Sequence, residues 1–232
     1  MTLIDRLRHY QAGCKRFLHR LTGRVKARGK QKVFCVGRNK TGTTSLTKAM
    51  ADLGYVIGDQ RYAECLIKDW GRRDFKKLLQ YCHTAEFFQD IPFSLPFTFQ
   101  AVDMFFPGSK FILTVRDEQA WYDSMYHFHR SASVHGDKAK SLAALKEAEY
   151  CYKGFAYDTK VLVYDLPGDD PYHKETLLEH YRYHNKMVKD YFKNRPGDLL
   201  VLDVSEPDAY KKLCDFIGKP CLRDSFPWEN KT

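Results

Sequence analysis

Residues 32–47 of the chain read KVFCVGRNKTGTTSLT. The apolar run at residues 33–36 predicts a buried strand, and two glycines, Gly37 and Gly42, bracket a turn that leads into a helix beginning at Thr43. A strand that enters a helix through such a turn points several unpaired backbone N–H groups toward one place, and the helix dipole adds positive potential there. The segment therefore predicts a binding site for phosphate or sulfate.

The spacing of this turn is close to that of the Walker P-loop, G-x-x-x-x-G-K-[ST], with both glycines and the hydroxyl residue Thr44 at matching positions. Thr43 stands where the P-loop has its lysine, and the lysine inside the turn is Lys40. The order Lys-Thr-Gly-Thr-Thr-Ser at residues 40–45 resembles the 5′-phosphosulfate loop of sulfotransferases that use 3′-phosphoadenosine 5′-phosphosulfate (PAPS). The alternative is an ordinary turn whose threonines only cap the helix.

A second motif makes the resemblance more specific. Residues 111–125, FILTVRDEQAWYDSM, predict an apolar strand that ends at Arg116 and a helix that carries Ser124. This pair resembles the family's 3′-phosphate site, where the planar arginine fork suits a phosphate and serine adds a neutral donor. Residues 196–228 also resemble the C-terminal part of small sulfotransferases, so the resemblance extends from about residue 32 to residue 228.

The resemblance implies an α/β fold of the P-loop-like sulfotransferase type in residues 31–232, and the predicted elements agree with it. Strands are predicted at 33–36, 85–89, 110–115 and 199–204, and helices at 43–53, 73–81, 95–106, 118–153 (two, with a break at 133–136), 176–192 and 207–217. Such alternation predicts one domain of three layers, a parallel sheet flanked by helices on both faces. Ligands bind such sheets beyond the carboxyl ends of the strands.

The resemblance also implies an activity, the in-line transfer of a sulfuryl group from PAPS to a hydroxyl or amine of an acceptor, which leaves adenosine 3′,5′-bisphosphate (PAP). The implied acceptor is a small molecule, carbohydrate or lipid that contacts segments 55–70, 91–106 and 126–175. Lys40 is expected to stabilise charge, and no metal ion is expected. The residues implied to bind PAPS are Lys40, Thr41, Gly42, Thr43, Thr44, Ser45, Arg116 and Ser124.

The acceptor hydroxyl must lose a proton during transfer, so a carboxylate or imidazole is expected near Lys40. Asp90 is the candidate base, because it follows the predicted strand 85–89, whose carboxyl end opens beside that of the strand 33–36 if the two are parallel. Alternatively, Asp90 caps the next helix or ties down the turn at Pro92. Weaker candidates for the base are His83, Glu86 and His129.

The remaining histidines and aromatics give weaker signals. No carboxylate or cysteine is grouped with His127, His129 and His135, or with His180 and His184, as a metal site would require. His127 or His129 is a candidate for the acceptor pocket. The aromatics of the same regions are expected mainly in the core rather than in a cleft: Phe87, Phe88, Phe93, Phe97, Tyr122 and Tyr126.

Two other functions fit parts of the sequence. A P-loop kinase or nucleotidase would need a magnesium-binding carboxylate at a strand end beside the loop, for which Asp117 is the candidate. A non-enzymatic module that binds membrane or nucleic acid would account for the basic N-terminus alone. The domain itself gives no sign of a nucleic-acid partner, because residues 1–30 hold a charge of +8 and the other residues only +1 of the total +9.

The N-terminal segment predicts an amphipathic helix over residues 1–22. Its apolar residues recur at spacings of four and three, and its basic residues occupy other faces. Such a helix either lies on an anionic membrane or packs on the domain with its charges in water. Residues 23–30 are predicted to form a flexible linker. The apolar stripe consists of Leu3, Leu7, Tyr10, Cys14, Phe17 and Leu21.

Composition favours a cytoplasmic protein, with peripheral membrane contact as the open alternative. The chain has 232 residues with 44% hydrophobic content, enough for one large domain. No apolar run approaches the roughly 20 residues of a membrane span or has the form of a signal peptide. The 7 scattered cysteines form no Cys-x-x-Cys pair and are expected to be reduced thiols.

Overall fold

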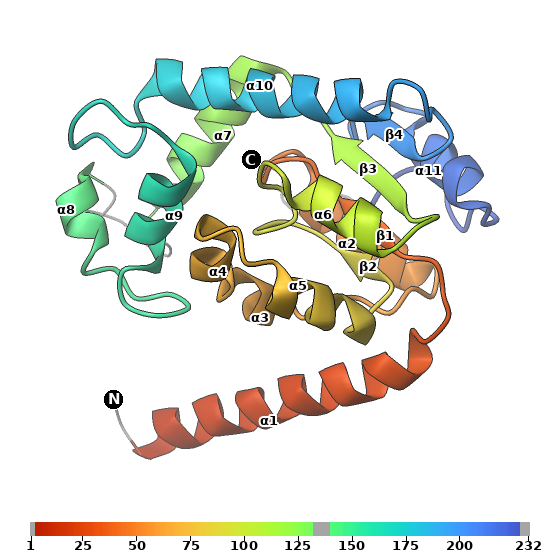
Figure 1. Ribbon diagram of the computed structural model, residues 1–232, viewed down its shortest axis with the longest axis horizontal. Coiled ribbons are helices and arrows are strands. Elements are labelled where there is room, and N and C mark those ends of the chain that lie inside the picture. The colour runs from red at the N-terminus through yellow and green to blue at the C-terminus, as the bar shows by residue number, and fades with distance from the viewer. Residues whose placement is uncertain (1–2, 132–139, 228–232) are drawn as a thin grey trace.

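The computed structural model describes residues 3–131 and 140–227, with the side chains from residue 13 onward (Figure 1). Four parallel strands in these residues form one sheet in the order β2-β1-β3-β4. The α/β parallel-sheet prediction is therefore confirmed, and each strand is shorter than predicted. The predicted helix break at 133–136 and His135 lie outside the described residues. The strands are β1 (Val33–Cys35), β2 (Phe87–Phe88), β3 (Lys110–Thr114) and β4 (Leu199–Leu202).

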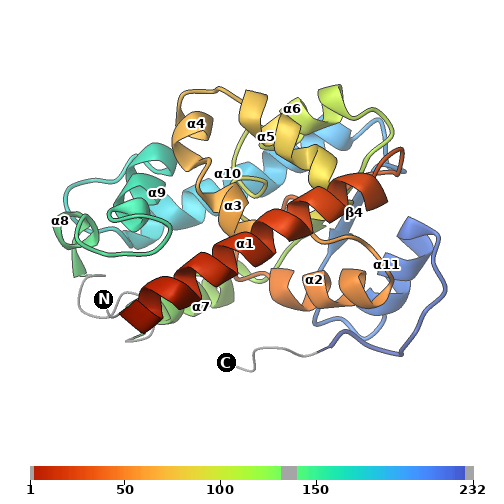
Figure 2. The same cartoon turned by 90° about the horizontal axis from the view of Figure 1, so that it is seen from below.

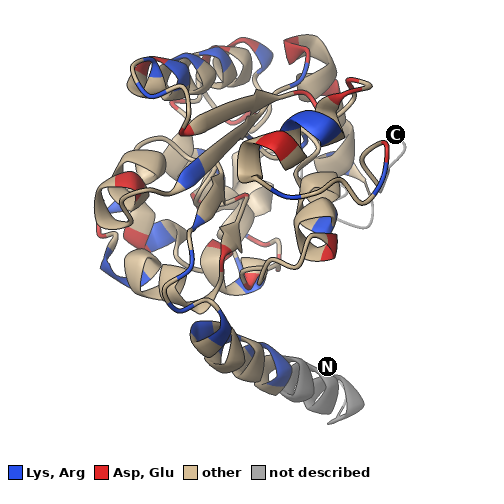
Figure 3. Ribbon diagram, turned by 90° about the vertical axis from the view of Figure 1, so that its right-hand side faces the viewer, with Lys and Arg blue, Asp and Glu red and all other residues tan. Residues whose placement is uncertain are grey.

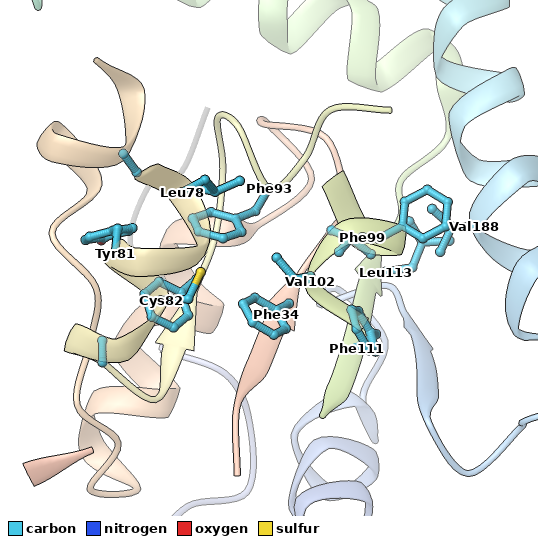
Figure 4. Close-up of a cluster of buried hydrophobic side chains, with 14 of the residues drawn as sticks. Phe34, Leu78, Tyr81, Cys82, Phe93, Phe99, Val102, Phe111, Leu113 and Val188 are labelled. Atoms are coloured by element: carbon cyan, nitrogen blue, oxygen red, sulfur yellow. The ribbon is translucent and has the colours of Figure 1, made fainter. Parts of the chain in front are cut away.

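Helices cover both faces of the sheet because neighbouring side chains of a strand point to opposite faces. Phe34 of β1 packs in a core with α5 (Lys76–Tyr81), α6 (Thr98–Phe105) and α10 (Lys174–Phe192) (Figure 4). Val33 and Cys35 point the other way, toward α2 (Thr43–Asp52) and α11 (Ala209–Ile217). The predicted core aromatics Phe87, Phe88 and Phe93 are fully buried, whereas Phe97 is exposed.

A group of short helices beside the sheet was not predicted. It comprises α3 (Gln60–Glu64), α4 (Ile67–Gly71), η1 (Cys82–Thr84) and α9 (Phe155–Val163). The region predicted as two helices forms α7 (Glu118–Arg130) and only a short α8 (Leu142–Leu145). Phe155 and Val163 of α9 pack against Ile67 and Trp70 of α4, so this group forms a small core of its own.

The N-terminal helix α1 (Leu3–Lys26) is longer than predicted, and the predicted linker is wrong over its first residues. Gly23 is a packing position, because a Cβ there would lie 2.2 Å from the carbonyl oxygen of Thr84 in η1. His19 Nε2 contacts the Ile57 carbonyl at 2.8 Å, and Arg20 forms an ion pair with Asp59. The second half of α1 therefore docks on the edge of the domain (Figure 2). No helix among the described residues combines the length and apolar content needed to cross a bilayer.

Candidate active site

The loop between β1 and α2 forms the predicted strand-to-helix turn. Gly42 precedes α2 with φ 89°. No side chain caps the N-terminus of α2, so the N–H groups of the first helical turn can face a ligand. Gly37 is required by close approach, because a Cβ there would lie 2.1 Å from Thr114 Oγ1 on β3. Lys40 also has a left-handed backbone, with φ 68°. Glycine is therefore needed at position 37 for close packing against β3 and is favoured at position 42 by the left-handed backbone.

Neighbouring elements fix this loop in place. Thr41 Oγ1 donates to the Arg38 carbonyl at 2.5 Å and lies 2.6 Å from Thr114 Oγ1. Trp121 of α7 donates its indole N–H to the Asn39 carbonyl at 2.9 Å, and its ring stacks on Tyr181 of α10 at 4.4 Å. The loop is therefore held by β3 and α7 together, which favours a preformed site.

A cavity of about 370 Å³ opens between the loop and the ends of β3 and β4. We call it the first cavity. Every residue that the sequence predicted to bind PAPS lines it, together with Asp90, so the structure brings the two predicted motifs to one place. Residues that follow β4 and the C-terminal Phe226 and Pro227 complete the wall. The predicted residues are Lys40, Thr41, Gly42, Thr43, Thr44, Ser45, Arg116 and Ser124.

Lys40 is half-buried in this cavity, and its Nζ lies 4.0 Å from the ring centroid of Phe128. Burial lowers the pKa of Lys40, the Arg116 charge lowers it further, and the Asp90 charge raises it. Lys40 thus interacts electrostatically with both residues. Two cations that share a cavity favour a ligand with several negative charges.

Arg116 is positioned through its backbone at the end of β3. Its N–H donates to the Tyr181 hydroxyl at 3.0 Å, and that hydroxyl donates to the Arg116 carbonyl at 2.9 Å. No acid in the described residues forms an ion pair with Arg116, so its guanidinium group remains available to a ligand. The adjacent Asp117 instead caps α7, accepting from the Ala120 N–H at 2.9 Å.

The magnesium carboxylate that a kinase would need is not found at this position. Asp117 is exposed and is not among the residues that line the first cavity. Within the ranges that the structure describes, no group of three or more His, Cys, Asp and Glu residues has the proximity of a metal site. His184 is buried and donates from Nε2 to the Val36 carbonyl at 2.7 Å, and burial lowers its pKa to about 3. It is therefore a neutral structural residue.

Asp90 stands at the end of β2, which is parallel to β1, so the assumption behind its prediction is confirmed. Its backbone is left-handed, with φ 58°, and its Oδ1 accepts from the Ile91 N–H at 2.9 Å. Burial raises the pKa of Asp90, against the Ile91 hydrogen bond and the charges of Arg38 and Lys40, which lower it. Asp90 thus ties its own turn, as the structural alternative expected, and it also lines the same cavity as Lys40. Its role as the base stays a prediction.

A second cavity, of about 320 Å³, adjoins the first. Asn39, Asp90 and Phe128 line both, so they stand at the junction. Most of the other lining residues fall within the three acceptor segments predicted from the sequence, whereas Arg38 and Met125 lie outside them. His129 lines this second cavity, whereas His83, Glu86 and His127 line neither of the two.

Three buried charged residues of the second cavity were missed. Arg38 lies inside the predicted turn between Gly37 and Gly42, so its position was a signal that could have been used. Glu64 and Lys160 lie in segments without a motif, and only the structure shows them buried. Burial raises the pKa of Glu64 to about 7, although hydrogen bonding by Cys151 and the Arg61 charge lower it.

Comparison with known proteins agrees with this geometry. Residues 32–232 match the family model described as the sulfotransferase domain, which covers all of the chain except α1 and the turn after it. Among curated proteins, none matches the chain significantly. The match includes the loop, the arginine and serine motif and both cavities. The chain therefore belongs to the sulfotransferase-domain family and is a transferase enzyme.

Proposed function

We propose that this enzyme transfers a sulfuryl group from PAPS to a hydroxyl or amine of an acceptor that binds in the second cavity. One observation carries the proposal. The first cavity is lined at once by the anion-binding loop around Lys40 and by Arg116 with Ser124, and Asp90 lies where it meets the second cavity. Two anion sites in one cavity fit a nucleotide with phosphate groups at its 3′ and 5′ positions.

The residues present supply each requirement of the transfer. The acceptor oxygen forms a bond to sulfur while the bond between sulfur and the bridging phosphate oxygen breaks. That oxygen leaves with the electron pair on PAP, where Lys40 neutralises the developing charge. The proton of the acceptor passes to Asp90, whose basicity is raised by burial. Catalysis then rests on positioning and charge, as in phosphoryl transfer.

A transfer assay tests the proposal directly. PAPS labelled in its sulfuryl group is incubated with the full chain and separate pools of phenols, aliphatic alcohols, sugars, amines and hydroxylated lipids. We expect a labelled product in at least one pool, with PAP formed in equal amount and without added magnesium. Transfer of phosphate from ATP with magnesium, and no label transferred from PAPS, would replace this function by a kinase.

Replacing Arg116 with alanine should mainly weaken nucleotide binding. Arginine hydrogen bonds to a charged group contribute about 1.5–3 kcal/mol, so the Kd for PAP should rise roughly 10- to 150-fold. The rate at saturating PAPS should change little, since the 3′-phosphate is remote from the reacting sulfur. Calorimetric titration of PAP measures the affinity. Arg182→Ala is the matched control, because that arginine pairs on the surface with Glu118 at 2.6 Å.

The opposite pattern would contradict the assignment of Arg116. If Arg116→Ala keeps the PAP affinity of the unmodified chain and loses turnover, the arginine does not hold the 3′-phosphate.

A further inference from the structure

The second cavity contains two buried cations whose surroundings differ from those of a structural ion pair. Arg38 is 3% exposed and donates to the Ser94 carbonyl at 3.1 Å and to the Tyr164 hydroxyl. Its Nε is buried with no hydrogen-bond partner in the described residues. Lys160 is 6% exposed, and its Nζ lies 3.9 Å from Met125 Sδ. Neither set of contacts includes a carboxylate.

The two cations lie against the same tyrosine ring, and the Arg38 charge acts on Lys160. The Lys160 ammonium is 5.2 Å from the ring centroid of Tyr164, and the Arg38 guanidinium carbon is 5.4 Å from the same centroid. The Tyr172 ring lies 4.1 Å from Lys160 Nζ. Electron-rich ring faces offset part of the cost of burying a cation, but they do not replace an anion.

Buried charges in proteins are normally paired, because an unpaired buried ion loses hydration without compensation. No acid in the described part of the chain forms an ion pair with Arg38 or Lys160. Two acids interact with them only at longer range. The Asp170 charge raises the pKa of Lys160, and the Arg38 charge lowers the pKa of Asp90. Of the other acids that line the cavity, Glu64 pairs with Arg61 at 3.7 Å, and Glu149 is exposed to solvent.

We propose that the acceptor is a hydroxy acid with an apolar, ring-sized body, whose carboxylate binds between Lys160 and Arg38 while its hydroxyl meets Asp90. The carboxylate supplies the charge that the two cations lack. The apolar body has a matching surface in Leu95, Phe155 and Val163, which line the same cavity. This inference rests on the proposed function, because it takes the second cavity as the acceptor site.

The proposal carries a pH dependence. Burial and, less strongly, the Arg38 charge lower the pKa of Lys160 to about 7, against the Asp170 charge, which raises it. Tyr164, Tyr172 and Met125 are the other side chains in contact with its ammonium group. An anionic acceptor binds the protonated lysine, so its affinity should be full below about pH 7 and should fall as the pH rises above that value.

Matched probes test the charge requirement. They are 4-hydroxybenzoate, 4-hydroxyphenylacetate and 3-(4-hydroxyphenyl)propanoate, each paired with its primary amide, and each is titrated into PAP-saturated protein at pH 6. We expect at least one acid to bind about tenfold or more tightly than its amide, the effect of a hydrogen bond to a charged group. That preference should shrink at pH 8.

Substitution identifies the lysine. Lys160→Met keeps the length and apolar contacts of the side chain and should remove the preference for the acid while leaving the affinity for the amide. Lys160→Gln serves the same purpose if the methionine variant melts early. Lys153→Met is the matched control, because that lysine is exposed and pairs with Glu147 at 2.5 Å, outside the cavity. It should keep the preference.

The inference is overturned if amides bind as tightly as acids, if no pair binds, or if the preference survives in both Lys160 variants. PAP affinity is measured first in every protein. Loss of PAP binding by the unmodified chain counts against the proposed function, whereas intact PAP binding without an acid preference counts only against the hydroxy acid.

A second inference follows independently from α1. Its apolar side chains Phe17, Leu18, Leu21 and Val25 are 49–77% exposed. Phe17 and Leu21 belong to the apolar stripe of the sequence, whose spacing is that of a buried helix face. The docking face of the helix is instead formed by Arg20 and Gly23, and the buried Ala27 follows them in the turn after the helix. At 100° per residue the two sets lie on different sides of the helix, so the apolar face points away from the domain. The side chains of Leu3, Leu7 and Tyr10 lie outside the described residues.

Charge identifies what fits this outer face of α1. The exposed basic residues Lys15, Arg24 and Lys26 of the helix flank it, and residues 6–51 contain no acidic residue. The coloured part of α1 shows Lys and Arg and no Asp or Glu (Figure 3). A narrow apolar strip between cations suits the boundary between headgroups and acyl chains of an anionic bilayer. We infer that the outer face of α1 binds an anionic lipid surface.

Vesicle sedimentation with the full chain tests this inference. We expect binding to vesicles that contain phosphatidylserine, little binding to phosphatidylcholine alone, and weaker binding as salt rises. The double variant Leu18→Glu, Leu21→Glu should lose the binding and keep PAP affinity. The matched control is Met104→Glu, Leu222→Glu, which changes two exposed apolar residues elsewhere and should bind as the unmodified chain does.

Equal binding to both vesicle types, or binding that survives in the α1 variant, would overturn the inference. So would the absence of vesicle binding together with concentration-dependent dimers that the α1 variant abolishes, since a second copy of the chain would then cover this face.

Discussion

The Asp90→Asn variant is expected to turn over roughly 10²- to 10⁴-fold more slowly than the unmodified enzyme, the usual contribution of a positioned general base. The change removes basicity and keeps the shape. Asparagine tolerates the left-handed backbone at this position, where φ is 58°, and its side-chain oxygen can still accept from the Ile91 N–H. PAP affinity should stay nearly unchanged, because binding of the nucleotide does not need the proton acceptor.

Steady-state kinetics with PAPS and the acceptor found in the transfer assay measure this effect. Activity of the unmodified enzyme should fall as the pH drops through the pKa of Asp90, which burial raises above the usual range of aspartate. Asp165→Asn is the control, because Asp165 is exposed and lies outside both cavities. A rate for Asp90→Asn within a few-fold of the unmodified enzyme would exclude Asp90 as the base.

Replacing Lys40 with alanine should remove the cation that neutralises the leaving oxygen. By analogy with the loss of one oxyanion donor, turnover should fall about 10²- to 10³-fold, or about 2.7–4 kcal/mol in the transition state. Lysine and alanine both carry a Cβ at this left-handed position, with φ 68°, so the variant adds no new backbone strain. The fold should therefore be retained.

Single-turnover rates at saturating PAPS separate chemistry from binding in this variant. Lys48→Ala is a suitable control, since Lys48 lies further along α2, is exposed and pairs with Asp52 at 3.8 Å. If Lys40→Ala changes only the affinity for PAPS and leaves the single-turnover rate intact, Lys40 does not act on the transition state.

The nucleotide side of the site could be predicted because its residues lie in two short continuous segments. In residues 33–45 and 111–125, the spacing of the residues predicts their geometry directly, since each segment is one strand, one turn and the start of one helix. Asp90 needed one further assumption, the parallel pairing of β2 with β1, which the structure confirms. The sheet order itself was not predicted, because no local pattern specifies which strands pair.

The acceptor side could not be predicted in this way. Its lining comes from helices far apart in the sequence, and no spacing rule relates Arg38 to Lys160. Helix α9 also escaped prediction because its apolar pattern is interrupted by Lys160, a buried lysine at a position where a core residue is expected. The prediction of a linker beginning at Gly23 was wrong because α1 continues to Lys26. A glycine that permits close packing looks the same in sequence as one in a flexible linker.

The proposed transfer requires that the first cavity bind the bisphosphorylated nucleotide of PAPS. Thermal unfolding of the full chain with PAP in EDTA, compared with ATP plus magnesium, GTP and NAD, tests it most directly. We expect PAP to stabilise the protein by about 2.7 kcal/mol at a hundredfold excess over its Kd, without a metal ion. Stabilisation by ATP with magnesium and none by PAP in EDTA would contradict it.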